Sequence, residues 1–114
     1  MRLLIAEDDP ALAEFMSFEL RRAGHDVEVA SEGYAALRLA EEQEFDLLVL
    51  DVVMPGIDGD IVARKARELR PEQAILFVTG SYGAARVGLE PTLYKPFGPD
   101  DLVRAVELAA KMGT

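Results

Sequence analysis

The chain has 114 residues, with 12 basic and 21 acidic side chains and a formal net charge of −9. This length predicts one compact domain, and half of the residues are hydrophobic, which is enough for a core. The sequence has no cysteine, which excludes disulfides and cysteine-based zinc sites, and its single histidine, His25, argues against a histidine-rich metal site or catalytic triad. The negative charge disfavours nucleic acid and anionic membranes as partners and favours cations or basic partners.

The sequence carries no signal for membrane insertion or export. No apolar run approaches the roughly 20 residues that span a bilayer, and the start MRLLIAEDD becomes acidic too early for a secretory signal. We therefore expect a soluble cytoplasmic protein. Met1 directly precedes the first predicted strand, which favours a native start. The sequence includes no output domain before it ends at Thr114, so we expect either a stand-alone receiver or a fragment of a longer chain.

Short apolar runs alternate with segments of helical periodicity along the whole chain. In chain order we expect a strand over 3–6, a helix over 10–23, a strand over 25–30, a helix over 34–41, a strand over 45–51, a helix over 61–69, strands over 74–79 and 92–95, and a helix over 99–112. In the first helix we expect Leu12, Met16, Leu20 and Ala23 to face the core. Strands that alternate with helices predict βαβ crossovers and a mostly parallel sheet.

The composition of the strands predicts their order. The strands over 3–6, 45–51 and 74–79 are apolar without interruption, which is typical of central strands covered on both faces. The strand over 25–30 alternates charged and apolar residues and the strand over 92–95 is brief, so we place both at the edges. Right-handed crossovers then give the order 2-1-3-4-5 in a doubly wound α/β fold. In such a sheet, a ligand crevice lies at the carboxyl ends of the first and third strands.

Three carboxylates are predicted at this crevice. Glu7 and Asp8 follow the first strand, and Asp51 ends the third. Like charges at short range repel one another, and a cation among them would offset that cost. Oxygen ligands without histidine or cysteine indicate Mg²⁺, with Mn²⁺ as a substitute. Asp9 precedes Pro10, so we interpret it separately, as the N-cap of the first helix.

Two further polar residues end strands at the same edge of the predicted sheet. Thr79 ends the fourth strand and Lys95 ends the fifth. Each is unremarkable alone, because threonine favours strands and lysine is often a solvated strand end. Beside a carboxylate-metal site, the lysine would supply positive charge and the threonine hydroxyl would donate to an oxygen of a phosphoryl group.

Together, the stretches AEDD, LLVLDVVMPGIDG, FVTG and YKPF resemble the receiver domain of two-component response regulators, and the resemblance extends over a single domain, residues 1–114. It implies that Asp51 is the phospho-acceptor, which receives a phosphoryl group from the phosphohistidine of a histidine kinase or a histidine phosphotransfer protein. The protein would then be a phosphotransfer substrate with weak self-dephosphorylation, more than a turnover enzyme. The sequence does not identify the kinase or a downstream partner.

The resemblance also implies the ligands of the site. Asp8 would bind Mg²⁺ directly, Glu7 would bind it mainly through water, and the backbone carbonyl of Val53 would be a further ligand. Thr79 and Lys95 would contact the phosphoryl oxygens. The peptide bond between Lys95 and the following proline is expected to be cis, as in the KP turn of that family.

The interval between Thr79 and Lys95 departs from the family pattern. It is short and contains Gly80, Gly83, Gly88 and Pro91. Each glycine costs a helix about 1 kcal/mol and a proline about 3 kcal/mol, so we expect the family's fourth helix to be absent or cut to about one turn. The stretch FVTGSY resembles a subgroup of receivers with a Phe-Ala-Thr-Gly-hydrophobic-Tyr signature, in which this helix is often degraded.

We expect the segment 80–91 to switch partner binding after phosphorylation. Thr92 stands where typical receivers carry an aromatic residue, so Tyr82 and Tyr94 are the candidates for the switch aromatic. On the first helix, the apolar residues Ala11, Phe15 and Phe18 form either a kinase-docking face or one flank of a wide core stripe.

Three other functions compete with this interpretation. A Mg²⁺-dependent aspartyl phosphatase would need a second aspartate at the position of Val53. A nucleotide- or flavin-binding module would need a glycine-rich turn after the first strand, and the stretch AEDDPALAE contains no glycine. A receiver-like binding module that is not phosphorylated stays open.

Overall fold

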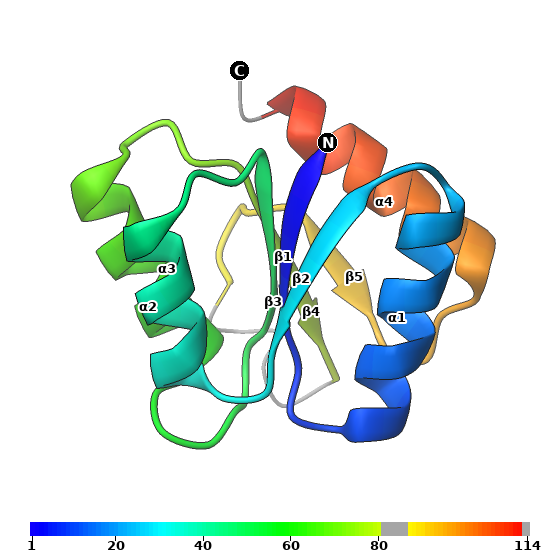
Figure 1. The fold of residues 1–114 in the computed structure, drawn as a ribbon, viewed down its shortest axis with the longest axis horizontal. Coiled ribbons are helices and arrows are strands. Elements are labelled where there is room, and N and C mark those ends of the chain that lie inside the picture. The colour runs from blue at the N-terminus through cyan, green and yellow to red at the C-terminus, as the bar shows by residue number, and fades with distance from the viewer. Residues whose placement is uncertain (81–86, 113–114) are drawn as a thin grey trace.

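The computed structural model describes residues 1–80 and 87–112, which contain five strands and four helices that alternate as far as β4 (Figure 1). In chain order they are β1 (Arg2–Ala6), α1 (Pro10–Arg22), β2 (Asp26–Ala30), α2 (Gly33–Glu42), β3 (Leu47–Asp51), α3 (Gly59–Leu69), β4 (Ile75–Thr79), β5 (Thr92–Tyr94) and α4 (Pro99–Met112). No helix within these ranges is long and apolar enough to cross a membrane.

The five strands form one parallel sheet in the order β2-β1-β3-β4-β5, which confirms the predicted doubly wound fold. Every residue of β3 and β4 is buried, as their uninterrupted apolar sequences predict. Strand β2 lies at one edge, with Asp26 exposed and Val27 buried, and the short β5 lies at the other.

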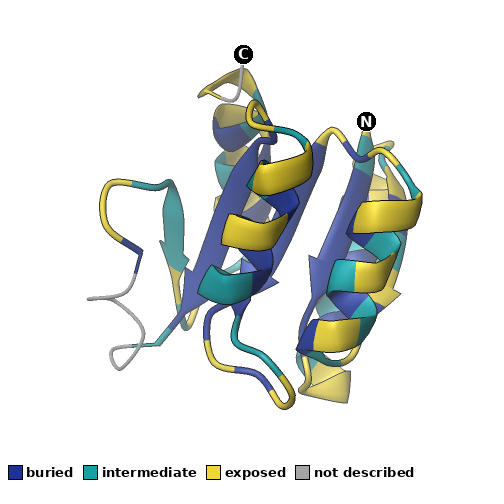
Figure 2. Ribbon diagram, turned by 90° about the vertical axis from the view of Figure 1, so that its left-hand side faces the viewer, coloured by how far each residue is buried: buried dark blue, intermediate teal, exposed yellow. Residues whose placement is uncertain are grey.

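Helices cover both faces of the sheet, with α2 and α3 on one face and α1 and α4 on the other (Figure 1). Figure 2 shows the central strands buried between helices that expose their outer sides. Successive residues of β1 alternate between the two core clusters, so that Leu3 packs with α1 and α4 whereas Leu4 packs on the opposite side. Each large apolar side chain buried in this way stabilises the fold by about 1.5–3 kcal/mol.

Helix α1 begins and ends at sequence signals. The side chain of Asp9 caps it, because Asp9 Oδ1 accepts hydrogen bonds from the backbone N–H groups of Ala11 at 3.0 Å and Leu12 at 3.4 Å. Gly24 ends it with a φ of 98°, in the left-handed region that favours glycine. The prediction that Ala23 faces the core is wrong: it is the C-cap residue and is exposed, because the helix ends at the preceding arginine.

Other boundaries differ slightly from those predicted. Helices α2 and α3 begin at Gly33 and Gly59, earlier than expected, because glycine is a poor helix former and its place in a first turn is not apparent from periodicity. The carboxylate of Glu32 caps α2 by accepting from the backbone N–H groups of its first turn. Strand β3 begins at Leu47 and β5 ends at Tyr94, so both strands are shorter than predicted.

The connection from β4 to β5 contains no helix in its described residues, Gly80 and 87–91, and the predicted shortening of the fourth helix is confirmed there. Residues 81–86, which include the candidate switch residue Tyr82, lie outside the described residues. Val87 is buried in the core cluster beneath α2 and α3. Arg67 of α3 pairs with Glu90, with 3.2 Å between Nη2 and Oε1, and so fixes this connection to the helix.

Candidate functional site

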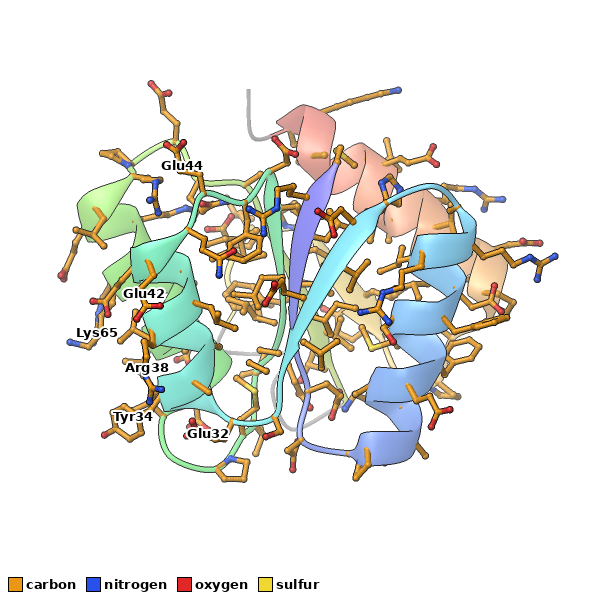
Figure 3. The ribbon with its side chains drawn as sticks, in the orientation of Figure 1. Glu32, Tyr34, Arg38, Glu42, Glu44 and Lys65 are labelled. Carbon is orange, nitrogen blue, oxygen red and sulfur yellow. The ribbon has the colours of Figure 1, made fainter. Side chains whose placement is uncertain are left out.

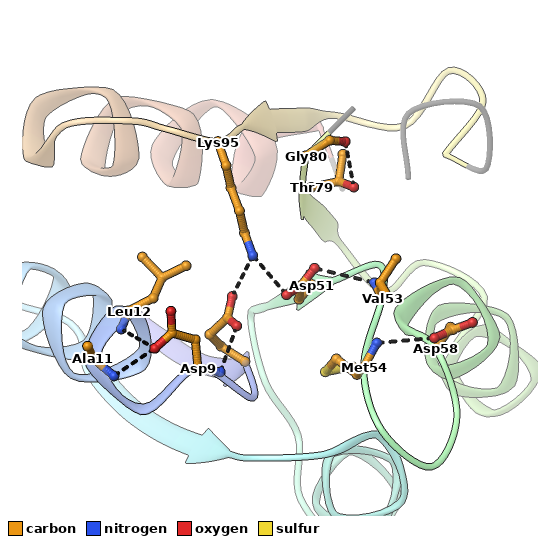
Figure 4. Close-up of polar contacts among 11 residues, drawn as sticks. Asp9, Ala11, Leu12, Asp51, Val53, Met54, Asp58, Thr79, Gly80 and Lys95 are labelled. Carbon is orange, nitrogen blue, oxygen red and sulfur yellow. Dashed lines mark hydrogen bonds and ion pairs between the residues drawn. The ribbon is translucent and has the colours of Figure 1, made fainter. Parts of the chain in front are cut away.

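Four strands direct the candidate side chains of the site to one edge of the sheet (Figure 4). Because the strands are parallel, their carboxyl ends lie at the same edge, and the order reverses between β1 and β3. Glu7 follows β1, Asp51 ends β3, Thr79 ends β4 and Lys95 follows β5.

The three predicted carboxylates lie together in the crevice. One oxygen from each of Glu7, Asp8 and Asp51 lies within 4.8 Å of the others. Glu7 and Asp51 are buried, with exposed fractions of 2% and 6%, whereas Asp8 is exposed to solvent. The cluster therefore combines two carboxylates that are shielded from solvent with one, Asp8, that solvent can reach.

The side chain of Lys95 points between two of these carboxylates. Its Nζ lies 2.9 Å from Asp51 Oδ2 (Figure 4). It also lies 3.2 Å from Glu7 Oε1. Burial alone would lower the pKa of Lys95, but the hydrogen bond and charge of Asp51, together with the charge of Glu7, raise it above its ordinary value. The sequence predicted Lys95 as a phosphoryl contact and assigned the balancing charge to a metal ion. In the structure, the ammonium group itself offsets part of the repulsion.

Glu7 is the most strongly perturbed carboxylate of the site. Desolvation by burial raises its pKa to about 7, and the charge of Asp51 acts in the same direction. The backbone N–H of Asp9, which donates to Glu7 Oε2 at 3.0 Å, and the nearby Lys95 offset part of this shift. Glu7 Oε1 is buried and accepts no hydrogen bond from the described residues, although the ammonium of Lys95 is close.

The donor set fits a hard divalent cation such as Mg²⁺. The clustered ligand atoms are all carboxylate oxygens, which Mg²⁺ prefers, and no histidine is among them. The buried Glu7 Oε1 without a hydrogen bond is an oxygen that a cation, directly or through its water, would satisfy.

Thr79 lies at the same edge but its hydroxyl is directed elsewhere. The side chain is buried, and Oγ1 donates to the carbonyl oxygen of Gly80 at 3.0 Å (Figure 4). Contact with a phosphoryl group on Asp51 therefore requires the hydroxyl to leave this local hydrogen bond.

The loop after Asp51 is folded back on itself. Asp51 Oδ1 accepts from the backbone N–H of Val53 at 3.3 Å, and Asp58 Oδ1 accepts from the backbone N–H of Met54 at 3.1 Å. The N–H of Gly59 donates to the carbonyl of Val52 at 2.8 Å. The contribution of Asp58 was missed in the sequence, although its place after a Pro-Gly turn was a signal for a loop-closing side chain. The expected cis bond between Lys95 and the following proline is present.

A doubly wound parallel sheet with these strand-end residues defines the receiver class of signalling domain. The family model of the response regulator receiver domain matches residues 3–107. The chain belongs to this family and is a receiver domain of a two-component response regulator.

Known relatives agree with this assignment. The chain is 38% identical over 115 residues to the response regulator receiver protein CpdR of Brucella abortus, with 93% of each chain covered. It is 30% identical over 122 residues to the alkaline phosphatase synthesis transcriptional regulatory protein PhoP of Bacillus subtilis; the match covers 96% of this chain and 51% of PhoP. The chain thus spans nearly all of one relative and about half of the other.

Solved structures are similar over nearly the full chain. A CheY-like response regulator receiver domain protein from Methanospirillum hungatei gives a TM-score of 0.89 at 27% identity, with coverage of 98% of this chain and 94% of that one. A response regulator receiver protein from Sinorhizobium medicae gives 0.89 at 28% identity, with coverage of 100% and 97%. The subgroup signature in FVTGSY stays a prediction.

Proposed function

We propose that Asp51 is the phospho-acceptor of this receiver domain and takes a phosphoryl group from the phosphohistidine of a histidine kinase or a histidine phosphotransfer protein. The observation that carries the proposal is the position of the Asp51 carboxylate, which is buried beside Lys95 Nζ at 2.9 Å and clustered with two further carboxylates. A buried aspartate that only stabilised the fold would not need the acidic neighbours that repel it.

In the proposed reaction an Asp51 carboxylate oxygen attacks the phosphorus in line. The new O–P bond forms as the N–P bond of the phosphohistidine breaks, and the departing imidazole keeps the electron pair and takes up a proton from solvent. Lys95 pairs with a phosphoryl oxygen as its contact with Asp51 is lost. The Thr79 hydroxyl turns from Gly80 to donate to another phosphoryl oxygen.

The metal in this proposal is Mg²⁺, with Mn²⁺ as a substitute. Asp8, Asp51 and the backbone carbonyl of Val53 would bind it directly, and Glu7 would bind it through water. When bound, Mg²⁺ offsets the negative charge of the transferring phosphoryl group. The exposure of Asp8 leaves this side of the cluster open to a hydrated ion, which suits a metal that keeps several waters.

The proposed product is an acyl phosphate that water later hydrolyses. The domain, which we take to be residues 1–114, is accordingly a phosphotransfer substrate with weak self-dephosphorylation. We infer that phosphorylation changes partner binding through the segment 80–91, which follows Thr79 directly. Its described part is held to α3 by Glu90, whose carboxylate pairs with Arg67.

We propose the outer face of α1 as the surface that meets the phosphodonor. Met16 and Leu20 turn into the core, but Phe18 is 61% exposed and lies in a hollow with Arg21 and Arg22. Phe15 is half-buried and packs against Phe97, with 6.4 Å between the ring centroids. The apolar residues of α1 therefore divide between the two interpretations: Phe15 packs onto the core, and Phe18 remains available to a partner. Phe18→Ala should lower labelling by a phosphohistidine protein. Labelling by acetyl phosphate should be unchanged, because this small molecule can enter the site without contacting the outer face of α1.

Incubation with acetyl phosphate tests the proposed reaction. With Mg²⁺, intact mass should increase by one phosphoryl group, and the increase should be absent from Asp51→Asn and from a sample treated with EDTA. An unmodified wild-type protein would instead favour the rival function, a receiver-like binding module that is not phosphorylated.

A further inference from the structure

The loop between β3 and α3, residues 52–58, is in direct contact with the first turn of α2. The backbone N–H of Gly33 donates to the carbonyl oxygen of Pro55 at 3.1 Å. Figure 3 shows Glu32 and Tyr34 at the end of α2 that faces this loop. A helix that is remote in sequence from Asp51 thus touches the loop that follows it.

The two backbones approach so closely that neither leaves space for a side chain. A Cβ on Gly33 would overlap the carbonyl oxygen of Ile57 and lie 2.7 Å from Ile57 Cγ1. Across the contact, a Cβ on Gly56 would lie 2.8 Å from Glu32 Oε2 and 2.9 Å from Tyr34 Cδ2. Gly56 also has a φ of 81°, in the region that favours glycine. Glycine is therefore required on both sides of the contact.

The same loop is fixed from its inner side by Gly59. The N–H of Gly59 donates to the carbonyl of Val52 at 2.8 Å, and a Cβ on Gly59 would overlap the carbonyl oxygen of Asp51. In sequence, Val53 stands between Val52, whose carbonyl contacts Gly59, and Pro55, whose carbonyl contacts Gly33. The side chain of Val53 is 52% exposed, so packing of that side chain contributes little to the position of its backbone.

We propose that Gly33 is a positioning residue for the metal site. The close contact with Gly33 fixes the backbone of the β3–α3 loop in the position from which the Val53 carbonyl can bind a cation beside Asp8 and Asp51. Glu32 supports this contact, because its carboxylate accepts from the N–H of Tyr34 at 3.1 Å and thereby holds the first turn of α2 in place. The inference rests on the proposed function, since it assigns a role toward the same Mg²⁺ ion.

Gly33→Ala tests the inference through the dissociation constant for Mg²⁺, measured by calorimetric titration at a temperature at which the variant is folded. The added methyl group would separate α2 from the loop and shift the Val53 carbonyl. Changes to residues that orient metal ligands weaken metal binding about tenfold or more, and we expect that increase in Kd. Labelling of the variant by acetyl phosphate should return to the wild-type level at saturating Mg²⁺, which a general loss of folding would not allow.

Gly24→Ala is the matched control. Gly24 has a φ of 98°, and no neighbouring heavy atom lies within 4 Å of the position that a Cβ would occupy. Alanine there strains the backbone far from the site without pushing on a neighbour. This variant should lose thermal stability and keep the wild-type Kd for Mg²⁺. A Gly33→Ala protein that binds Mg²⁺ as tightly as the wild type would overturn the inference.

A second variant serves if Gly33→Ala does not fold. Glu32→Ala removes the carboxylate that holds the first turn and inserts no atom into the contact. It should weaken Mg²⁺ binding several-fold, and an unchanged Kd would again overturn the inference. A wild-type protein without saturable Mg²⁺ binding, or an Asp8→Asn protein that binds equally well, would overturn both the proposed metal site and this inference. If only the role of Gly33 is wrong, the wild type binds Mg²⁺, Asp8→Asn does not, and the Gly33 and Glu32 variants bind as tightly as the wild type.

Discussion

Lys95 Nζ lies 2.9 Å from Asp51 Oδ2, and this contact joins the end of β5 to the end of β3 across the intervening β4. The ammonium group also lies 3.2 Å from Glu7 Oε1, so one cation faces two buried carboxylates. The charge balance of the site in the absence of a metal therefore depends on Lys95.

Replacement of Lys95 by methionine should destabilise the metal-free domain. Removal of one partner of a buried ion pair costs about 3–5 kcal/mol, and because the side chain of Lys95 is 31% exposed we expect a smaller loss of about 2 kcal/mol. Urea unfolding in EDTA measures the difference, and millimolar Mg²⁺ should restore part of it. Lys65→Met, at an exposed position of α3, is the control and should change stability little. Equal stability of the two variants would show that Lys95 does not balance the carboxylates.

Mg²⁺ should stabilise the folded domain. Binding to the folded state alone adds about 2.7 kcal/mol at a concentration one hundred times Kd. Asp8→Asn should remove this response. It should also raise stability in EDTA, because Asp8 adds negative charge beside Glu7 and Asp51. Thermal melts with EDTA and with millimolar Mg²⁺ provide the measurement. An equal melting temperature of the wild type under the two conditions would contradict the metal site.

The stability of the metal-free domain should fall as the pH rises from about 4.5 to about 7, the ordinary and folded-state pKa values of Glu7. In this window the folded state keeps the Glu7 proton that the unfolded state has released, so the free energy of unfolding decreases with pH. Glu7→Gln should remove this contribution, and the difference between the two proteins in urea unfolding isolates it. Mg²⁺ affinity of the wild type should rise over the same window, because loss of the Glu7 proton places a further negative charge beside the water-bound ion. A difference that is constant with pH would mean that Glu7 titrates normally.

Much of the site could be predicted from the sequence because parallel strands place their carboxyl ends at one edge. The uninterrupted apolar strands gave the strand order, and that order brought Glu7, Asp8 and Asp51 together as expected. The N-cap role of Asp9 followed from its place before a proline and is confirmed.

Most features that were not predicted depend on contacts between segments distant in sequence, and one depends on where a helix ends. The position of Lys95 between two carboxylates depends on the direction of a flexible side chain, which strand periodicity does not determine. Gly33 and Gly59 were not assigned to helices, because glycine disfavours helices and the reason for its presence is a backbone from another segment. Ala23 fits the apolar stripe of α1 but lies beyond the end of that helix.

The contact between α3 and the connection before β5 should contribute measurably to stability. Arg67 pairs with both carboxylate oxygens of Glu90, and the two side chains are 33% and 30% exposed. We expect a coupling free energy of about 1 kcal/mol from a double-mutant cycle with Arg67→Met and Glu90→Gln. The single Arg67→Met change should cost more than Glu90→Gln, because Arg67 Nε also donates to the carbonyl of Gln73 at 3.1 Å. A coupling near zero would show that the connection is held by apolar contacts such as those of Val87.

The position of the phosphoryl group on the chain is the most direct test of the proposed role of Asp51. The protein is treated with acetyl phosphate and Mg²⁺ and then with borohydride, which reduces an aspartyl phosphate to homoserine, and peptide mapping finds the reduced residue. We expect homoserine at position 51 alone, and none when EDTA replaces Mg²⁺. Reduction at any other carboxylate, or equal labelling without a divalent cation, would contradict the assignment of Asp51 as the metal-dependent phospho-acceptor.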